Sequence, residues 1–174
     1  MTPTAVPART RDRFVEEWLA STLQTYPEQT GRFLRDERDP FRNPVGQTLR
    51  TGLTALVAEL LGDFDRPRVA AALEAIVRIR AVQDFTPAEA VGFVLLARRA
   101  ARAVAGDGDP GVGPLDALDA RVDDMALVAF DLYARCREEI HAIGARAARR
   151  RVYVLERVQG LADDLGADPS AVRD

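Results

Sequence analysis

Apolar residues recur at intervals of three and four positions through most of this chain, a period typical of helices with one buried side. From Arg11 onward the period gives one stripe, made of Phe14, Val15, Trp18, Leu19, Thr22 and Leu23. After Pro44 it gives another, made of Leu49, Leu53, Leu56, Val57, Leu60 and Leu61. No segment alternates apolar and polar residues between turns, as a half-buried strand would. The pattern predicts an all-α fold: a single bundle of about six helices with a long C-terminal helix.

Short motifs predict where two of these helices begin. Asn43 followed by Pro44 fits an N-cap and a first helical residue. Thr86 and Glu89 have the spacing of a capping box, in which the threonine caps the helix and the glutamate side chain reaches back. The helix beyond Thr86 has almost no polar side until Arg98, so we expect neighbouring helices to cover most of it.

The chain has 174 residues, 47% of them hydrophobic, which fits one domain with an extension. We expect a flexible N-terminal arm over residues 1–10, a helical domain over 11–145 and a C-terminal helical extension or linker over 146–174. The glycine- and aspartate-rich stretch at 106–114 predicts a flexible connector rather than a calcium loop, because a calcium loop needs further oxygen ligands in register. Without a signal peptide or a long apolar run, the chain reads as cytoplasmic.

The charge pattern excludes several chemistries. Every one of the 24 basic residues is arginine, so a Schiff-base lysine, a P-loop lysine and a Ser–Lys dyad are all excluded. The net charge of -3 argues against attraction of the whole surface to nucleic acid. The densest basic run, Arg146 to Arg151, has acidic neighbours at Glu138, Glu139 and Glu156. A solvated helix face is favoured there over docking, and no nucleic acid or membrane partner is expected.

Candidate catalytic groups are few. The one cysteine, Cys136, leaves no internal disulfide, and it lies five positions from the one histidine, His141. On a helix that spacing places the two side chains about 140° apart, so they form no local dyad. We therefore expect no enzyme, no catalytic residue, no metal site and no cofactor. Cys136 is expected in the core, with His141 at the edge of the core.

Two arginines and an aspartate precede the apolar helix, and they supply the ligand or network candidates Arg78, Arg80, Asp84 and Phe85. One interpretation is that the arginines hold an anionic ligand, or a charged network that shifts on binding. The other is structural: Asp84 caps a helix or pairs with an arginine and keeps the corner rigid. The structural interpretation is the favoured one.

Near the C-terminus, steps of four and three residues trace a heptad-like seam through Ile140, Gly144, Ala147, Arg151, Val154, Val158, Leu161 and Leu165. Val154, Val158, Leu161 and Leu165 are its interface candidates. The seam indicates either a helix that pairs with its copy, as a homodimer, or a helix that covers the core of its own bundle. The residues favour neither alternative.

Three segments together resemble the RsbRD N-terminal domain family of RsbT co-antagonists in bacterial stress signalling: "FLRDERDPFRNPVGQTL", "IVRIRAVQDFTPAEAVGFV" and "FDLYARCREEI". The similar region runs from about Arg32 to about Ile143. The resemblance implies a sensory domain of globin-like fold without haem, which dimerises and connects through a helix to a STAS output domain. A chain ending at Asp174 is too short to include STAS, so we expect a stand-alone regulator or a fragment of a longer protein such as a sensor kinase.

The function expected from these observations is a non-catalytic, cytoplasmic signal-sensing domain. It would relay a ligand or partner signal through helix packing and its C-terminal helix, to a protein partner of the pathway or to an output domain. The alternative is a small-molecule or haem-binding protein of globin-like fold, for which His141 would be the only histidine available.

Overall fold

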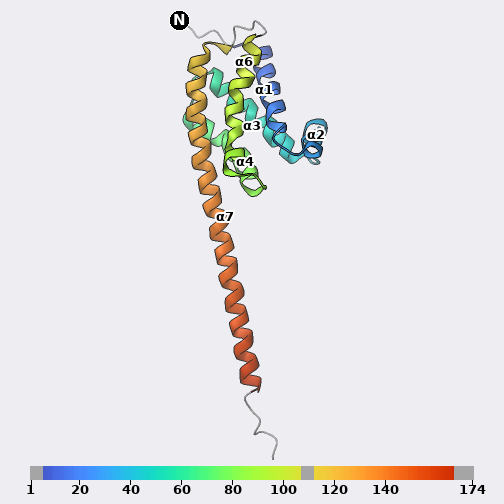
Figure 1. The fold of residues 1–174 in the computed structure, drawn as a ribbon, viewed down its shortest axis with the longest axis vertical. Coiled ribbons are helices and arrows are strands. Elements are labelled where there is room, and N and C mark those ends of the chain that lie inside the picture. Colours follow the sequence, from blue (N-terminus) through green and yellow to red (C-terminus); the bar gives the residue numbers. More distant parts are fainter. Residues whose placement is uncertain (1–5, 107–111, 167–174) are drawn as a thin grey trace, which may run out of the picture. The chain divides into compact units, whose positions relative to one another are not determined.

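The structure is a computed structural model that describes residues 6–106 and 112–166, with the side chains of Glu156 and residues 160–166 excepted. Within these ranges every regular element is a helix. In order they are α1 (Ala8–Leu23), α2 (Glu28–Asp36), α3 (Pro44–Leu61), α4 (Arg66–Val82), α5 (Pro87–Gly92), the 3₁₀ helix η1 (Phe93–Leu95), α6 (Leu96–Gly106) and α7 (Leu115–Gly166) (Figure 1). The prediction of an all-α bundle with a long C-terminal helix is confirmed.

The chain divides into two compact units, and the division falls inside α7. The first unit ends at Cys136 and the second begins at Arg137. The predicted connector includes residues 107–111, which lie outside the described residues, as do residues 1–5 of the predicted N-terminal arm. The described part of the chain contains no helix long and apolar enough to span a membrane.

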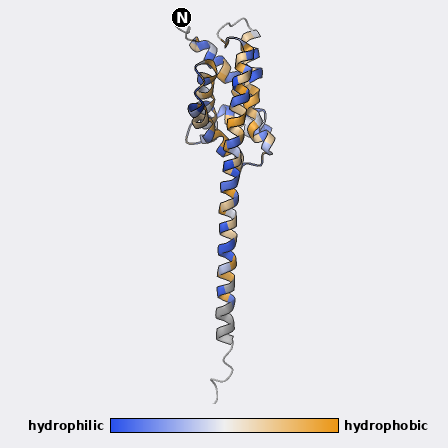
Figure 2. Ribbon diagram, turned by 90° about the vertical axis from the view of Figure 1, so that its left-hand side faces the viewer, coloured by the Kyte–Doolittle hydropathy of each residue, from blue (hydrophilic) through white to orange (hydrophobic). Residues whose placement is uncertain are grey.

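The core of the first unit lies where α1 packs against α3 and α6 and where α3 packs against α4. Phe14, Trp18, Leu49 and Leu73 have no exposed surface, as the three-and-four period predicts. Figure 2 shows hydrophobic, orange segments along the helices of this unit, alternating with hydrophilic, blue ones. Burial of these side chains is the main term that stabilises such a bundle.

The predicted caps are present. The Asn43 side chain accepts a hydrogen bond from the Gly46 amide at 2.8 Å, and its amide group donates to the carbonyls of Leu34 and Glu37 at 3.0 and 2.9 Å. Asn43 therefore caps the start of α3 and also binds the end of α2. The side chain of Thr86 accepts from the Glu89 amide, and the Glu89 carboxylate accepts from the Thr86 amide, which completes the capping box.

Two helix limits differ from the prediction. α1 begins at Ala8 rather than Arg11, because the Pro7 carbonyl already accepts hydrogen bonds from the amides of Thr10 and Arg11. The single helix expected after Thr86 is instead interrupted by η1. A 3₁₀ turn inside a helical run marks a local change in hydrogen bonding, and the side chains that cause it here come from other helices.

In the first unit, α7 contributes one buried side to the core. Leu118, Val122, Met125 and Ala129 are at most 3% exposed. The Arg121 guanidinium donates to the Leu60 carbonyl at 2.6 Å, so α7 also supplies a partner for the C-terminal end of α3.

Candidate functional site

Arg80, near the end of α4, is the charged side chain at the centre of the candidate site. It has no exposed surface, although arginine is rarely fully buried. Its place on α4 follows from the helical period, since Ile76 and Val77, one turn earlier, are also fully buried. Protein groups, rather than water, must therefore stabilise the charge of this guanidinium.

Three hydrogen bonds tie the Arg80 guanidinium to other elements. Nε donates to the Ala90 carbonyl at 3.2 Å, and Nη2 donates to the Glu89 carbonyl at 2.9 Å. Nη2 also donates to the hydroxyl of Thr25, in the turn after α1, at 3.0 Å. Arg80 therefore joins α4, α5 and the end of α1 through one side chain.

Aromatic rings complete the surroundings of this guanidinium. Its central carbon lies 4.0 Å from the centre of the Phe85 ring, 5.1 Å from that of Tyr26 and 5.4 Å from that of Phe93. Tyr26 and Phe85 contact each other edge to face, with centroids 5.1 Å apart. Ring faces attract a cation, so the three rings stabilise the positive charge in place of water. We call Thr25, Tyr26, Arg80, Phe85 and Phe93 the Arg80 cluster.

The α5–η1 break belongs to this cluster. The carbonyls of Glu89 and Ala90 bind Arg80, and the Phe93 carbonyl accepts a hydrogen bond from Nε1 of Trp18 at 2.7 Å. The Glu89 and Ala90 carbonyls thus bind a side chain of α4, and the Phe93 carbonyl accepts from both Trp18 and the Leu96 amide. This is the physical reason why the single helix predicted there is broken.

Burial shifts both ionisable groups of the cluster. It lowers the pKa of the Arg80 guanidinium from its usual value, with Tyr26 and Glu89 opposing the change. It raises the pKa of the Tyr26 hydroxyl above 10.0, with Arg80 opposing it. Arg80 stays charged and Tyr26 neutral at neutral pH. The charge is held without a carboxylate partner among the described residues, since the Glu89 carboxylate binds Thr86.

Several polar atoms around the cluster have no hydrogen-bond partner. Arg80 Nη1 and the Tyr26 hydroxyl are buried and unpaired, and so are the Thr22 hydroxyl and the Gln83 side-chain oxygen. Unpaired buried polar atoms are few in natural proteins, and each is costly. Two of these four atoms, Arg80 Nη1 and the Tyr26 hydroxyl, belong to the Arg80 cluster itself.

The structure separates the four residues predicted as ligand or network candidates. Arg80 and Phe85 meet in the cluster. Arg78 is exposed and pairs with Glu74 one turn earlier on α4, at 3.2 Å, and Asp84 is exposed. The corner is thus held by Arg80 and main-chain carbonyls. Among the described residues the Asp84 side chain forms no ion pair, and the N-cap of α5 is Thr86.

Sequence reasoning missed the partners that come from far along the chain. Thr25 is 55 positions from Arg80, and the turn containing Thr25 and Tyr26 has no motif that links it to α4. Phe93 lies in the nearly all-apolar helix predicted after Thr86, where the sequence does not distinguish a ring beside a cation from any other core residue. The one usable signal was that Arg80 falls on the buried stripe of α4.

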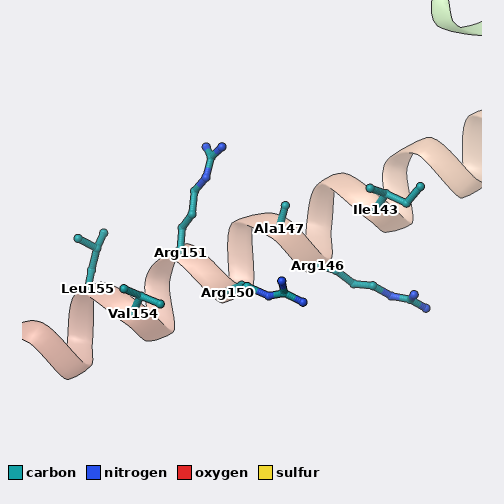
Figure 3. Close-up of a pocket in the computed structure, with 7 residues that line it drawn as sticks. All are labelled: Ile143, Arg146, Ala147, Arg150, Arg151, Val154 and Leu155. Carbon is teal, nitrogen blue, oxygen red and sulfur yellow. The ribbon is translucent and has the colours of Figure 1, made fainter.

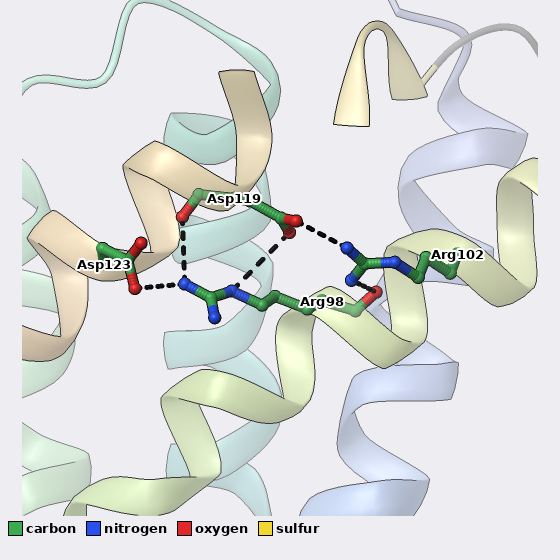
Figure 4. Close-up of polar contacts among 4 residues, drawn as sticks. All are labelled: Arg98, Arg102, Asp119 and Asp123. Carbon is green, nitrogen blue, oxygen red and sulfur yellow. Dashed lines mark hydrogen bonds and ion pairs between the residues drawn. The ribbon is translucent and has the colours of Figure 1, made fainter. Parts of the chain in front are cut away.

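A second polar cluster joins α6 to α7 within the first unit (Figure 4). The Asp119 carboxylate lies 2.5 Å from Arg102 Nη2 and 3.6 Å from Arg98 Nε. Arg98 also forms an ion pair with Asp123, and its guanidinium donates to the Asp119 carbonyl at 3.3 Å. These groups are partly exposed, so they position the start of α7 more than they create a reactive site.

In the second unit the apolar seam residues are exposed. Val154 and Val158 are 53% and 57% exposed, whereas the side chains of Leu161 and Leu165 lie outside the described residues. A hollow lined by Ile143, Arg146, Ala147, Arg150, Arg151, Val154 and Leu155 follows one side of this helix. All of these side chains extend from the same helix, with Arg151 opposite Arg146 and Arg150 in the view of Figure 3. The hollow is thus a helix face flanked by arginines.

Cys136 and His141 lie in different settings. The Cys136 side chain is 7% exposed and packs in the first unit, as expected for a core cysteine. His141, in the second unit, is exposed. In the described part of the chain, no group of three or more histidine, cysteine or acidic side chains is placed to hold a metal ion.

Comparison with known protein families identifies a match over most of the chain. The family model described as "RsbT co-antagonist protein rsbRD N-terminal domain" matches residues 12–151, which is most of the chain. No curated protein and no solved structure matches the chain. The matched range includes the whole Arg80 cluster and the Arg98–Asp119 contacts.

Proposed function

The chain belongs to the rsbRD N-terminal domain family of RsbT co-antagonist proteins, and we propose on this basis that it is a non-catalytic signal-input domain of stressosome-type signalling in the cytoplasm. The family supports a regulatory role in signalling. The finer parts of the proposal are that a ligand or protein partner is sensed by the helical bundle, and that the response passes to α7 and a homodimer.

The Arg80 cluster is the observation that carries the sensing part. One buried guanidinium holds the carbonyls of Glu89 and Ala90 and the Thr25 hydroxyl, and no carboxylate of the described residues neutralises it. A partner that shifts any one of these three segments changes the hydrogen bonds of all of them. Buried polar networks of this kind respond as a unit, because a half-satisfied network is costly.

Helix α7 supports the second part of the proposal, that the response passes to this helix and to a homodimer. It contains residues that are buried in the first unit, such as Met125, and the exposed seam residues of the second unit, such as Val154 and Val158. In our proposal Val154, Val158, Leu161 and Leu165 contact the same residues of a second copy. The heptad-like spacing is typical of such pairing.

Arg151 sets a limit on the strength of this pairing. It occupies a seam position between Ala147 and Val154, so a parallel homodimer would bring two guanidinium groups close together. A single polar residue at such a position fixes the register of a coiled coil and lowers its stability. We therefore propose a weak, reversible dimer. A reversible dimer suits a signalling switch better than a permanent dimer does.

Two valines of equal exposure provide the test. Val152 and Val154 are both 53% exposed, yet they lie about 160° apart around the helix axis. We expect Val154→Glu to weaken the dimer by about tenfold or more, because it places a carboxylate in the apolar seam. Val152→Glu should leave dimerisation unchanged. Sedimentation velocity over a range of protein concentrations measures both.

The same measurement can reject the dimer. If the wild-type chain sediments as a monomer at all concentrations, or if Val152→Glu and Val154→Glu have equal effects, the seam is not a dimer interface. Arg151→Leu provides a gain-of-function check, since it removes the charge from the seam and should tighten association.

A further inference from the structure

The hollow along α7 in the second unit has apolar side chains that solvent reaches. Ile143, Val154 and Leu155, which line it, are 66%, 53% and 63% exposed. Ala147 has the shortest side chain among the lining residues, so the longer side chains before and after it enclose a concave place. We call this place the Ala147 hollow. Several large apolar side chains exposed on one helix face are typical of a surface that another molecule covers.

The spacing of the apolar residues fits a second helix as that molecule. Ile143, Ala147 and Val154 are separated by four and seven positions, and they lie within about 40° of one another around the axis of α7. A narrow apolar stripe of this kind is typical of helices that pair side by side. A short side chain within the stripe leaves a hole, and a bulky side chain of the facing helix inserts into such a hole.

Arginines border the hollow on both sides. Figure 3 shows Arg151 extending to one side of the helix and Arg146 and Arg150 to the other. Between Ile143 and Val158 the chain has five arginines and a single glutamate, so this part of the helix is strongly positive. A helix packed in the hollow places its own flanking side chains beside these arginines. Aspartate or glutamate at those positions accepts charge-assisted hydrogen bonds, whereas a basic residue is repelled.

We infer that the Ala147 hollow binds an acidic amphipathic helix of a protein partner, with a bulky apolar side chain in the hollow and carboxylates beside Arg146, Arg150 and Arg151. The inference rests on the proposed passage of the response to α7, and it names the chemistry of the partner. A second copy of this chain fits the hollow less well, because it brings arginines beside arginines. An acidic helix should therefore displace the second copy from the weak dimer.

An anionic lipid surface would also attract these arginines, but the rest of the helix argues against it. A helix that lies on a membrane needs a strongly polar side facing water. Val152 and Tyr153 lie more than about 100° from Ala147 around the axis, and they are 53% and 58% exposed. The side away from the hollow is thus partly apolar as well. A narrow stripe between arginines fits a partner helix better than it fits a lipid surface.

The test uses a synthetic peptide of about three heptads, with leucine at the a and d positions and glutamate at the e and g positions. A second peptide, with lysine in place of every glutamate, is the comparison. We expect the glutamate peptide to bind the full chain by isothermal titration calorimetry and the lysine peptide not to bind. Binding of the glutamate peptide should weaken as salt is added, because salt screens charges at a surface.

Two neighbouring arginines provide the matched control. Arg150 lines the hollow, whereas Arg149 does not and lies about 160° from Ala147 around the axis. Both are exposed, so neither substitution endangers folding. Arg150→Glu should weaken binding of the glutamate peptide by about tenfold or more, because it brings like charges together. Arg149→Glu makes the same change in net charge and should alter binding by about twofold or less, since solvent and salt screen the more distant charge.

Two further comparisons separate the charge from the apolar contact. Arg150→Glu should bind the lysine peptide more tightly than the wild-type chain does, since the reversed charge now attracts lysine. Ile143→Asn should weaken binding of the glutamate peptide, because it removes an apolar contact in the stripe. Val152→Asn, on the side away from the hollow, should leave binding unchanged.

Several results would overturn the inference. These are absence of binding of the glutamate peptide, equal binding of the two peptides, equal effects of Arg149→Glu and Arg150→Glu, and binding of the chain to phosphatidylglycerol vesicles without binding of the glutamate peptide. Failure here is distinguishable from failure of the proposed dimer. The sedimentation experiment on Val152 and Val154 uses no peptide, and binding of the peptide does not require the chain to dimerise.

Discussion

The guanidinium carbon of Arg80 lies 4.0 Å from the centre of the Phe85 ring; Arg80 is in the last turn of α4, and Phe85 is in the connection from α4 to α5. The contact brings a cation and an aromatic face together where water is excluded. Such a contact is worth more in this setting than at a surface, because the cation cannot recover its hydration by moving away.

Replacing Arg80 should therefore destabilise the bundle. Arg80→Met leaves the carbonyls of Glu89 and Ala90 without their donor, and each unpaired buried acceptor costs about 1–3 kcal/mol. We expect a loss of at least about 2 kcal/mol in the free energy of unfolding, measured by urea denaturation at a fixed protein concentration. Arg80→Lys should recover little of it, since an ammonium group cannot reproduce the planar fork.

The matched control for this substitution is Arg78→Met on the same helix. Arg78 is exposed and contacts Glu74, so its loss should change the unfolding free energy by about 0.5 kcal/mol or less. Similar losses for Arg78→Met and Arg80→Met would contradict the role assigned to the buried guanidinium.

A close contact between α3 and α4 yields a prediction that depends on two residues. A Cβ added at Gly52 would lie 2.6 Å from the Cδ1 atom of Ile76. Gly52→Ala should cost about 1–3 kcal/mol through overpacking, despite the better helix propensity of alanine. Ile76→Val removes Cδ1, so Gly52→Ala should cost less in that background. A double-mutant cycle by urea denaturation measures the coupling, and additive effects would show that the contact is not limiting.

The capping box at the start of α5 should make part of the stability depend on pH. Hydrogen bonds from the Thr86 amide and hydroxyl lower the pKa of Glu89 below its usual value of 4.5. Because the folded pKa is the lower one, this stabilisation is present above pH 4.5 and is lost as the pH falls through the folded pKa. The stability difference between wild type and Glu89→Gln should shrink over that acid range in urea titrations.

Thr86→Ala tests the threonine half of the capping box. It removes the N-cap oxygen, which typically costs about 1 kcal/mol. A stability difference between wild type and Glu89→Gln that stays constant from about pH 7 to about pH 3 would contradict the assignment of the acid-sensitive part to Glu89.

The junction of α6 and α7 should respond to salt. Asp119 contacts both Arg98 and Arg102, so Asp119→Asn should cost about 1 kcal/mol at low ionic strength. The cost should fall at high salt, because these groups are partly exposed and screened. Asp131→Asn, an exposed aspartate further along α7, is the control for the general effect of removing one negative charge.

The helix caps and the break at η1 show how much of the fold could be predicted from the sequence. The caps at Asn43 and Thr86 were predictable because each motif lies within a stretch of four residues. The break at η1 was not, because its cause is a set of side chains from distant helices: Trp18 donates to the Phe93 carbonyl from 75 positions away. Local periodicity carries no information about such contacts.

The candidate site shows the same division. Arg80 and Phe85, two of the four candidates, are close in sequence and contact each other in the structure, whereas Arg78 is exposed to solvent. A helix turns by about 100° per residue, so two arginines separated by one position lie on different sides. Tyr26, which completes the cluster, comes from a turn that no sequence motif connects to α4.

Arg121 completes the C-terminal end of α3 by binding the Leu60 carbonyl, 61 positions earlier in the chain. During synthesis, α3 and the surface against which Met125 and Ala129 pack are made before α7, which supplies their contacts. A chain released at that stage would expose the apolar surface that α7 covers in the folded domain. Chaperones bind such surfaces, and proteases cleave chains that expose them. We therefore expect a chain shortened to α1–α6 to leave exposed the apolar surface that Met125 and Ala129 cover.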